Sequence, residues 1–440
     1  MEANGPIGEI PTFIRKRLLL LQGGQFRYGK PLKFGIRAPS YFLTCPEDIK
    51  HVLAVNAGNY AKTRHIASEK GQARLGRGLI SSTGEEHHRK RRLLWPSFRK
   101  SSIQPAFAAL VTRRISDLCE SWLPGLKLDV AEAMTRLTES IIIGVLFGSD
   151  YQDEGEKLLW AIRQRRLYNE YYYGSRLPWR QHLPLPVVKN HKLAVAHIDQ
   201  VISTEIERRR DSPREPGDLL SMYLTSSYQD GTALTDQEVR DEILPLTTTG
   251  YETTGDGLAW AFHLLSQHPE VAQRVHQEVH QVVGARDPAI EDLVRLPYTA
   301  SVIHEALRLY PPTWTYVRVC LSADTLPSGL PLKSGDQLFL SQYLMHRHPT
   351  HFPEPDRFIP ERFSCPKESR SRQFVYFPFG EGAHRCIGEH LALLEMHLTV
   401  ATLVKKFRME PTGTEGPKLV AGLTLRPDSG IWVRLQLHQP

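Results

Sequence analysis

The stretch Phe377–Gly388 reads FPFGEGAHRCIG and places one cysteine, Cys386, directly before a helical pattern. Its glycines allow positive φ angles, so the backbone can form an irregular turn and approach a flat ligand closely. Ile387–Val404 then alternates apolar and polar residues at helical spacing, which places Cys386 at a helix N-terminus. The dipole and the unpaired N–H groups there favour a thiolate over a thiol, and His384 and Arg385 lie nearby. We therefore predict that Cys386 is a metal ligand.

A lone cysteine is more often a small buried hydrophobic residue. That interpretation fits the other four cysteines, Cys45, Cys119, Cys320 and Cys365. Cys386 differs because an ordered run of aromatic residue, glycines and histidine precedes it. The five cysteines form no CxxC pair, which argues against a disulfide framework or a zinc cluster and fits a reducing compartment.

Composition indicates an ordinary globular protein. Of the 440 residues 41% are hydrophobic and 23% are charged, and no linker or repeat divides the chain. The formal net charge of +7 does not indicate nucleic-acid binding, and it fits an acidic protein partner or a plain solvated surface equally well. No apolar run approaches the ~18 residues of a membrane span, and Leu18–Leu21 is too short for a signal peptide. We expect a cytoplasmic protein with one domain over residues 1–440 and no transmembrane anchor.

Helical patterns dominate the chain. Helices are expected from Pro46, over Ile103–Gly148 with a cap at Asp129, over Glu154–Tyr173, and near Asn190–Arg210. Two strands are expected in Leu32–Thr44, and a β-hairpin in Leu419–Leu437 with its turn at Arg426–Gly430. Loops are expected over Ala61–Ser82 and Leu177–Val188. The pattern predicts a mainly α fold with a small β portion.

The longest helical pattern runs from Thr235 to Gln267 and begins with a capping box, Thr235 to Glu238. At 1.5 Å per residue it would span ~48 Å, enough to cross the whole molecule. Its middle contains Pro245 and the poor helix formers of Thr247–Gly250 and Thr253–Gly255. Local rules that fail inside a buried element point to a functional site.

The run Phe377–Gly388 resembles the haem-ligand signature of the cytochrome P450 family, F-G-x-G-x-H-x-C-x-G. The sequence meets every fixed position, with Phe379, Gly380, Gly382, His384, Cys386 and Gly388. The resemblance implies that Cys386 is the axial thiolate ligand of a haem iron, which favours O–O cleavage. It also implies the cytochrome P450 fold, with haem b between the long central helix and the cysteine loop.

A second motif of that family is met inside the long helix. Gly250 to Thr254 resembles the oxygen-activation motif [AG]-G-x-[DE]-T-[TS]. The resemblance implies that Gly250 borders the haem and that Glu252 and Thr253 are catalytic residues that deliver protons. Thr249 departs from the alanine or glycine that is usual at the first position. Its larger side chain would narrow the space above the haem and so affects which substrate sizes fit.

Further motifs concern haem binding and the support of the cysteine loop. The pair His87 and Arg91 resembles an H-x-x-x-R element that contacts the haem propionates, with the register His88 and Arg92 left open, and Arg318 stands where the family has another propionate ligand. Glu305 and Arg308 resemble the E-x-x-R motif, which pairs with the arginine of a P-E-R-F element, here Arg362. The implied role of this second group is structural, a buried network that holds the cysteine loop.

The implied reaction is insertion of one O2 oxygen, by hydroxylation or epoxidation, into an apolar small molecule such as a fatty acid, terpenoid or polyketide. Electrons would come from a separate ferredoxin or flavodoxin-type donor with its reductase, because no flavin or nicotinamide module fits in the remaining length. An acidic donor is expected to dock on bases around one helix, namely Arg89, Lys90, Arg92 and Arg99. The resemblance also implies a lid over the substrate channel that bears Leu167, Tyr171, Tyr172 and Leu177, and a C-terminal hairpin whose tip reaches the substrate.

Two alternatives stay open. A haem-thiolate peroxygenase or isomerase would not need the pair Glu252 and Thr253, so their presence disfavours it. A non-catalytic haem sensor would need an output domain, and none is visible in the sequence. We expect a monomer that binds no nucleic acid.

Overall fold

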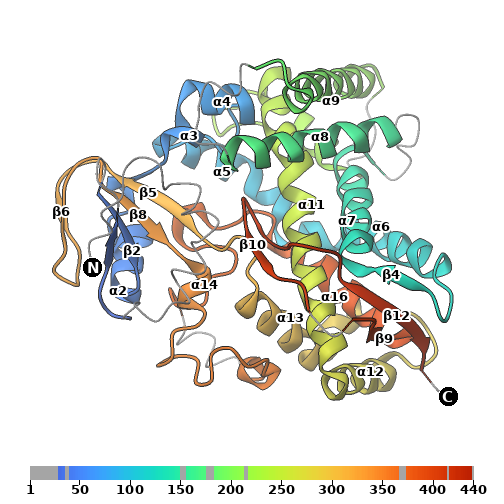
Figure 1. Cartoon of the computed structure of the whole chain (residues 1–440). Coiled ribbons are helices and arrows are strands. Elements are labelled where there is room, and N and C mark those ends of the chain that lie inside the picture. Colours follow the sequence, from blue (N-terminus) through green and yellow to red (C-terminus); the bar gives the residue numbers. More distant parts are fainter. Residues whose placement is uncertain are drawn as a thin grey trace.

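One long helix, α11 (Asp236–Gln267), runs through the middle of the computed structural model (Figure 1). The structure describes residues 28–34, 39–148, 155–174, 183–212, 217–365, 373–413 and 416–438. The predicted capping box is present, because Thr235 Oγ1 accepts from the N–H of Glu238 at 3.2 Å and the Glu238 carboxylate accepts from the N–H of Thr235 at 2.9 Å. The helix continues through Pro245 as one element, so the poor helix formers in its middle are held by packing rather than by propensity.

The other helices pack around α11 and supply most of the core. The α-helices are α2 (Pro46–Lys50), α3 (Arg64–Ala67), α4 (Glu69–Leu75), α5 (Gly84–Phe98), α6 (Lys100–Glu120), α7 (Val130–Phe147), α8 (Gly155–Gly174), α9 (Pro186–Asp211), α10 (Leu219–Leu224), α12 (Pro269–Val283), α13 (Pro297–Leu309), α14 (Gln342–Met345) and α16 (Glu389–Lys406). Shorter helical turns are η2 (His51–Val55), η3 (Ala57–Asn59), η5 (Ile290–Arg295), η6 (Pro360–Phe363) and η7 (Gly382–His384). The predicted cap of α7 is confirmed, since Asp129 Oδ1 accepts from the N–H of Ala131 at 3.0 Å.

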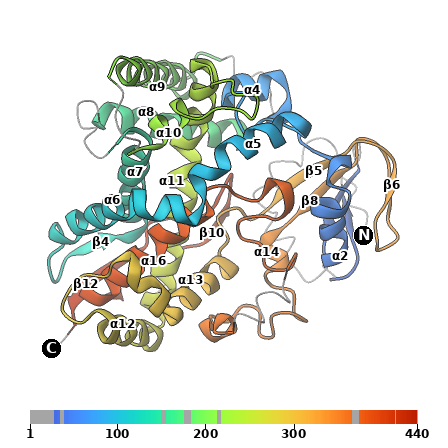
Figure 2. The same ribbon diagram turned by 180° about the vertical axis from the view of Figure 1, so that it is seen from behind.

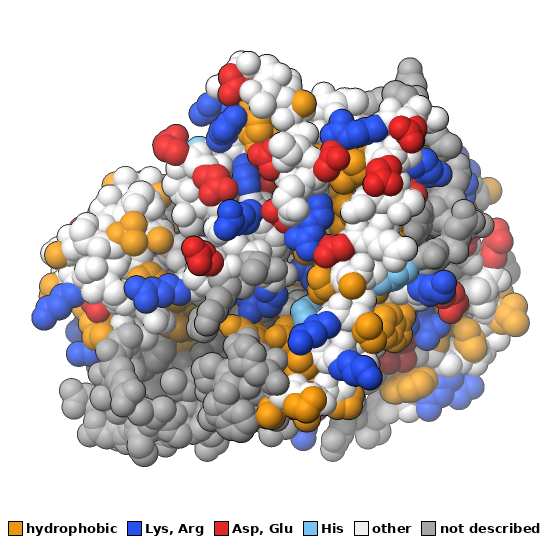
Figure 3. All heavy atoms as spheres, turned by 90° about the horizontal axis from the view of Figure 1, so that it is seen from above, with side chains coloured by type: hydrophobic (Ala, Val, Ile, Leu, Met, Phe, Trp, Pro, Cys, Tyr) orange, Lys and Arg blue, Asp and Glu red, His pale blue; other side chains and the backbone are white. Residues whose placement is uncertain are grey.

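Helices α8 and α9 lie side by side across one end of α11 (Figure 1). Seen from behind, α5 leads into α6 on the side of the molecule where α16 begins (Figure 2). On the face above α8 and α9, Lys and Arg side chains are interspersed with Asp and Glu (Figure 3). That end of the molecule therefore carries no field of a single sign.

The β portion is small and is divided among four sheets. The largest has the order β1-β2-β8-β5-β3, made of β1 (Leu32–Phe34), β2 (Ser40–Leu43), β8 (Gln337–Leu340), β5 (Tyr316–Cys320) and β3 (Tyr60–Lys62). The others pair β4 (Lys127–Asp129) and β9 (Phe407–Pro411) with β12 (Trp432–Leu437), β10 (Leu419–Ala421) with β11 (Leu425–Pro427), and β6 (Asp324–Thr325) with β7 (Pro331–Leu332). The predicted fold class, mainly α with a small β portion, is confirmed.

The prediction for the C-terminal tail was wrong in its pairing. Leu419–Ala421 pairs with Leu425–Pro427, so the turn of the hairpin lies at residues 422–424 and not at Arg426–Gly430. The last strand, β12, joins a different sheet, where it pairs with β4 and β9. Alternation shows that a segment is a strand, but the partner is decided by packing far away in the sequence.

Two predicted loops also differ from the structure. Ala61–Ser82 contains the end of β3 and the helices α3 and α4, the second of which is capped by Ser68 through its hydroxyl and the N–H of Gly71. The two helices are short and their sequence is polar, so they show no sustained apolar periodicity by which a helix could be predicted. Helix α9 begins at Pro186, inside the loop predicted for Leu177–Val188, and Leu177 lies outside the described residues. Proline is well suited to this first helical position.

Candidate functional site

The loop before α16 is a tight turn built around glycine conformations. Gly380 and Gly382 have φ angles of 72° and 71°, values that a residue with a Cβ rarely adopts. The N–H of Cys386 donates to the carbonyl of Phe379 at 2.8 Å and closes the loop. A Cβ on Gly382 would overlap the carbonyl oxygen of Leu53, so the loop and η2 approach each other in a way that only glycine permits. The backbone thus fixes where Cys386 points.

The Cys386 thiol is accessible to solvent although protein surrounds it closely enough that burial raises the pKa of the thiol. These two properties together describe a side chain at the bottom of a deep opening. The N–H of Gly388 lowers the pKa but does not outweigh burial. Helix α16 begins at Glu389 with Gly388 as its N-cap, two residues beyond the expected start at Ile387, so the helix terminus favours the thiolate through the Gly388 N–H but less strongly than burial opposes it. A bound metal ion would deprotonate the sulfur directly.

Helix α5 presents one of the two predicted registers to this loop. His87 is buried, and its Nε2 lies 3.0 Å from Nδ1 of His384. Arg91 donates from Nη1 to the carbonyl of Arg385 at 2.7 Å. In contrast, His88 and Arg92 are exposed. Of the two registers left open by the sequence, His87 and Arg91 face the cysteine loop.

Two more cations lie beside this pair, on the largest sheet. Lys62 on β3 is directly opposite Arg318 on β5, and both are held away from water. The pKa of Lys62 is lowered to about 7, chiefly by burial and also by the neighbouring Arg318. Burial also lowers the pKa of His384 to about 2, with Lys62 and Arg318 acting in the same direction. Cations that lie close together and are largely buried repel one another and lose hydration, so this cluster is electrostatically unfavourable without a bound anion.

One face of α11 is accessible in the middle of an otherwise buried helix. Between Asp241 and Phe262 every residue is buried except five. These five recur at helical spacing, and we call them the accessible face of α11: Leu246, Thr249, Gly250, Thr253 and Asp256. A row of accessible side chains on a helix that the rest of the fold encloses marks an internal opening rather than the outer surface.

The predicted catalytic pair lies at this face. Thr253 is partly accessible, and its hydroxyl donates to the carbonyl of Thr249 at 3.0 Å, within its own helix. Glu252 is buried on the neighbouring face, where its Oε1 accepts from the Thr424 hydroxyl at 3.2 Å. Burial raises the pKa of Glu252, partly offset by Arg166. The structure therefore places an acid with raised pKa one residue from an accessible hydroxyl.

Gly250 contributes through packing as well. A Cβ built on it would lie 2.5 Å from Cδ1 of Ile142, and one on Gly255 would lie 2.9 Å from the Thr138 hydroxyl oxygen. Both contacts are with α7, so the glycines let α7 and α11 pack closely. Whether Gly250 also borders a haem remains a prediction.

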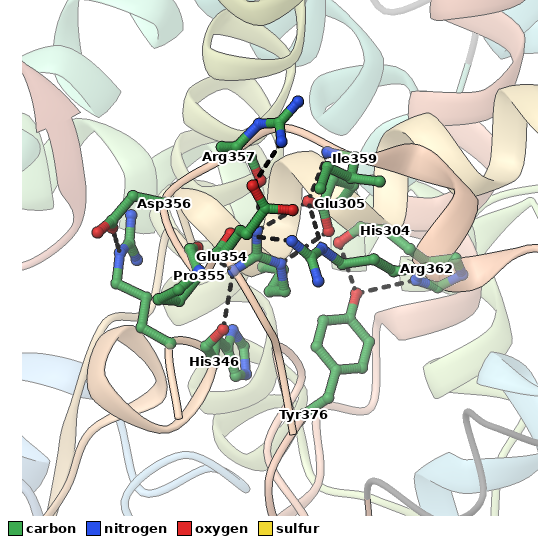
Figure 4. Close-up of polar contacts among 12 residues, drawn as sticks. His304, Glu305, His346, Glu354, Pro355, Asp356, Arg357, Ile359, Arg362 and Tyr376 are labelled. Carbon is green, nitrogen blue, oxygen red and sulfur yellow. Dashed lines mark hydrogen bonds and ion pairs between the residues drawn. The ribbon is translucent and has the colours of Figure 1, made fainter. Parts of the chain in front are cut away.

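The predicted network of Glu305, Arg308 and Arg362 is present and buried (Figure 4). Arg308 donates to both Glu305 carboxylate oxygens at 2.7 and 2.8 Å, and Arg362 Nε lies 3.4 Å from Glu305 Oε1. Arg308 also donates to the carbonyl of His346 at 3.0 Å, and His346 Nε2 in turn accepts from the N–H of Phe377 at 3.0 Å. The network is thereby tied to the first residue of the cysteine loop.

A haem fits this donor set. Cys386 has an accessible sulfur that could bind an iron. The largely buried cations Lys62, Arg91 and Arg318 could pair with two propionates. Among the residues that the structure describes, none of these three cations forms an ion pair with a carboxylate, and His87 Nδ1 is buried without a hydrogen-bond partner. A carboxylate-bearing planar cofactor would satisfy these groups. We propose that Cys386, His87, Arg91, Arg318 and His384, with Phe379 and Gly380 of the loop, hold it.

Sequence reasoning missed Lys62, Arg166, Asp256 and Thr424. A buried lysine leaves no local signal in a three-residue strand, and Thr424 was assigned to an arm of the hairpin rather than to its tip. Asp256 did leave a signal. It follows Glu252 by four residues and so shares a helix face with it inside a buried element.

A mainly α fold around a cysteine loop with a cluster of largely buried cations beside it is typical of a haem-thiolate protein. A family model described as Cytochrome P450 matches residues 27–433, and the chain belongs to the cytochrome P450 family. It is similar to cyclooctat-9-en-7-ol 5-monooxygenase of Streptomyces melanosporofaciens, with 35% identity over 84% of this chain and 80% of that protein. Cyclooctatin synthase of the same organism is 32% identical over 90% of this chain and 84% of that protein.

Solved structures agree on the fold. The crystal structure of a triple mutant of the cytochrome P450DA heme domain superposes with a TM-score of 0.87, covering 99% of this chain and 97% of that chain at 23% identity. The wild-type heme domain gives a TM-score of 0.84 with 96% and 92% coverage. The chain is thus a haem-dependent oxidoreductase of the monooxygenase class. Within its described part, no helix has the length and apolarity to cross a bilayer.

Proposed function

We propose that this protein inserts one oxygen atom of O2 into a largely apolar alcohol of the terpenoid class, using haem b and electrons from a separate donor. The observation that carries the proposal is the accessible face of α11, where the Thr249 and Thr253 hydroxyl groups stand next to the buried acid Glu252. Haem, held through the Cys386 thiolate, supplies the activation of O2 and the cleavage of its O–O bond. The chain's own residues bind and orient the substrate, exclude water and move protons.

Thr249 supports an alcohol among the possible substrates. Its hydroxyl donates its single hydrogen to the carbonyl of Pro245 at 3.0 Å, so only its lone pairs are left for a ligand. A substrate hydroxyl could donate to these lone pairs, whereas a fatty-acid carboxylate could only be repelled by them. The name of the relative cyclooctat-9-en-7-ol 5-monooxygenase also denotes an unsaturated alcohol as substrate.

A titration of substrate-induced spectral shifts tests the substrate class. We expect a terpenoid alcohol to bind more tightly than its parent hydrocarbon, and a fatty acid of similar length to bind weakest. Thr249→Val removes the acceptor and should weaken the alcohol by about three- to tenfold, the value of one hydrogen bond. Binding of the hydrocarbon serves as the control and should change little. Tight binding of fatty acids alone would exclude the proposed class.

Protons for the reaction are proposed to pass from Glu252 to the accessible side of α11 by way of Thr253. The observed bond from Thr253 to the Thr249 carbonyl uses the hydroxyl hydrogen but leaves oxygen lone pairs that can accept a proton or a bond from water. A buried threonine that bonds only within its helix would have a structural role instead. The two roles differ in what happens to the electrons that the enzyme consumes.

In Thr253→Ala we expect haem and substrate to bind as before. The amount of product formed per electron consumed should fall about 100-fold, at the lower end of the range for general acid assistance. The missing product should be replaced by hydrogen peroxide. Thr254→Ala is a matched control, because Thr254 is the next residue and is buried away from the accessible face. Peroxide and product measured together decide between the roles: an unchanged ratio in Thr253→Ala means that the hydroxyl only stabilises its helix.

One of the four bases expected to meet the electron donor is not at the surface: Lys90 is buried and pairs with Glu86 at 3.1 Å. Arg89, Arg92 and Arg99 are exposed, and Arg89 pairs with the exposed Asp230 at 3.2 Å. Arg99 and Lys100 are exposed where α5 meets α6, and Lys100 acts electrostatically on His397 of α16. Because α16 follows the cysteine loop, we propose that an acidic ferredoxin or flavodoxin-type donor docks at Arg99 and Lys100.

A further inference from the structure

A second carboxyl group lies beside Glu252 and has no part in the family's motif. Asp256 is one helical turn further along α11; protein surrounds its carboxyl group closely, although the residue as a whole is partly accessible. The tip of the β10–β11 hairpin brings Thr424 against both acids. The Thr424 hydroxyl donates to Glu252 Oε1 at 3.2 Å, and it lies near enough to the Asp256 carboxyl to lower the pKa of that group. Oδ2 of Asp256 is buried and has no hydrogen-bond partner among the described residues.

The hairpin tip is held firmly in place. Trp260 Nε1 donates to the carbonyl of Leu425 at 3.0 Å, and Trp314 Nε1 donates to the carbonyl of Gly422 at 3.1 Å. The N–H of Leu425 donates to the carbonyl of Pro312 at 2.9 Å. These bonds flank Thr424 on both sides along the chain. The backbone at Thr424 is therefore held in place beside the two acids.

The charges around the two acids require one bound proton. Helix α8 contributes Arg166 and Glu170, whose Nε and Oε1 atoms lie 3.5 Å apart. Strand β11 contributes Arg426, whose Nη2 donates to Glu170 Oε2 at 3.0 Å. Two guanidinium groups thus face three carboxyl groups, and a single proton makes the cluster neutral. The pKa of Asp256 is raised to about 7, chiefly by burial and also by the neighbouring Glu252.

The remaining ionisable groups nearby do not alter this balance. Tyr251, the residue of α11 before Glu252, has a pKa raised by burial and stays neutral. From α7, Glu139 faces Tyr251 but is paired with Arg163 at 2.6 Å. Arg166, Glu170 and Arg426 are each partly exposed, so the cluster reaches solvent on its outer side.

The shared proton can lie on either acid, and the Thr424 hydroxyl then donates to the other acid. A threonine hydroxyl has one hydrogen, so Thr424 cannot donate to two carboxylates at once. While it donates to Glu252, its contact with Asp256 is favourable only if Asp256 is protonated and donates to Thr424 Oγ1. We propose that Asp256 is the proton reservoir for Glu252 and that the Thr424 hydroxyl is the bridge between them.

In this relay the O–H bond of Asp256 breaks and its proton passes to Thr424 Oγ1, while the former hydroxyl proton of Thr424 passes to Glu252 Oε1. The hydroxyl is regenerated, the net change is one proton moved from Asp256 to Glu252, and solvent reprotonates Asp256 at the exposed side of the cluster. Asp256 and Thr424 act through Glu252 and are positioning residues. The inference rests on the proposed role of Glu252 in proton delivery.

Infrared difference spectra of the haem-loaded protein, recorded between mildly acidic and mildly alkaline pH, test the reservoir without turnover. We expect a carbonyl band of a protonated carboxyl that disappears in Asp256→Asn. Glu242→Gln is the matched control, since Glu242 is another buried acid of α11 whose pKa burial raises to about 7. It should remove a band of its own and leave the Asp256 band intact. Persistence of every carbonyl band in Asp256→Asn would overturn the proposal.

The pH profile of product formed per electron tests the bridge. In the wild type this ratio should fall as pH rises through about 7, because Asp256 loses its proton. Asp256→Asn and Thr424→Val should each lower it by about tenfold and flatten the profile, and Asp256→Glu and Thr424→Ser should restore it. If Glu252→Gln lowers the ratio while Asp256→Asn and Thr424→Val keep the wild-type profile, the relay is wrong and the role of Glu252 stands. If Glu252→Gln itself has no effect, the proposed function fails first.

Discussion

Replacing Cys386 with alanine should abolish the thiolate-type absorption of the reduced carbon monoxide complex and all monooxygenase activity. The expected loss is complete because one sulfur both holds the iron and donates the electron density that favours O–O cleavage. The loop geometry makes the position irreplaceable: Gly380 and Gly382 occupy positive φ, and the Cys386 N–H is bound to the Phe379 carbonyl. The spectrum of the reduced protein with carbon monoxide, recorded at matched protein concentration, measures the effect.

Cys320→Ala is the matched control for this experiment. Cys320 is buried on β5, two residues from Arg318, and its thiol is bonded to the Ser322 carbonyl at 2.9 Å. Its loss leaves a small cavity and should lower stability without changing the type of absorption. If the absorption survives in Cys386→Ala and is lost in Cys320→Ala, the assignment of the axial ligand is wrong.

The cysteine loop could be predicted because its determinants are local. Its glycines and Cys386 lie within twelve consecutive positions, Phe377–Gly388, and two of these glycines, Gly380 and Gly382, adopt the positive φ angles that glycine permits. The same is true of α11, whose capping box at Thr235 and Glu238 involves four consecutive residues. When the residues of a motif are consecutive, the backbone angles and hydrogen bonds that determine its geometry involve only those residues and can be inferred from the sequence.

Features that depend on distant pairing could not be predicted in this way. The sequence leaves open whether His87 or His88 faces inward, because both stand in a basic stretch, and burial against the cysteine loop decides between them. Burial gives Lys62 its low pKa, and Arg318, which is adjacent only because β3 pairs with β5, contributes to it. Thr424 meets Glu252 only because the hairpin turns earlier than its alternation suggests.

Replacing Arg308 with methionine should produce the largest loss of stability among the substitutions outside the cysteine loop. The side chain is of similar length, so the change removes charge and donors with little change in volume. It would leave the Glu305 carboxylate fully buried with only the 3.4 Å contact to Arg362 and the N–H of Ile359. The carbonyls of His346, Pro355 and Arg357 would lose their donor. Breaking one side of a buried pair costs about 3–5 kcal/mol in the free energy of unfolding.

Urea unfolding followed by far-ultraviolet circular dichroism measures this loss, and Arg357→Met is the matched control. Arg357 forms an ion pair with Glu354 at the same spacing of three residues, but both side chains are mostly exposed. Such pairs contribute at most about 1 kcal/mol, so the control should unfold near the wild-type midpoint. Because Arg308 reaches Phe377 through His346, Arg308→Met should also bind less haem at equal protein concentration. Equal midpoints for the two variants would mean that the buried network neither stabilises the fold nor supports the cysteine loop.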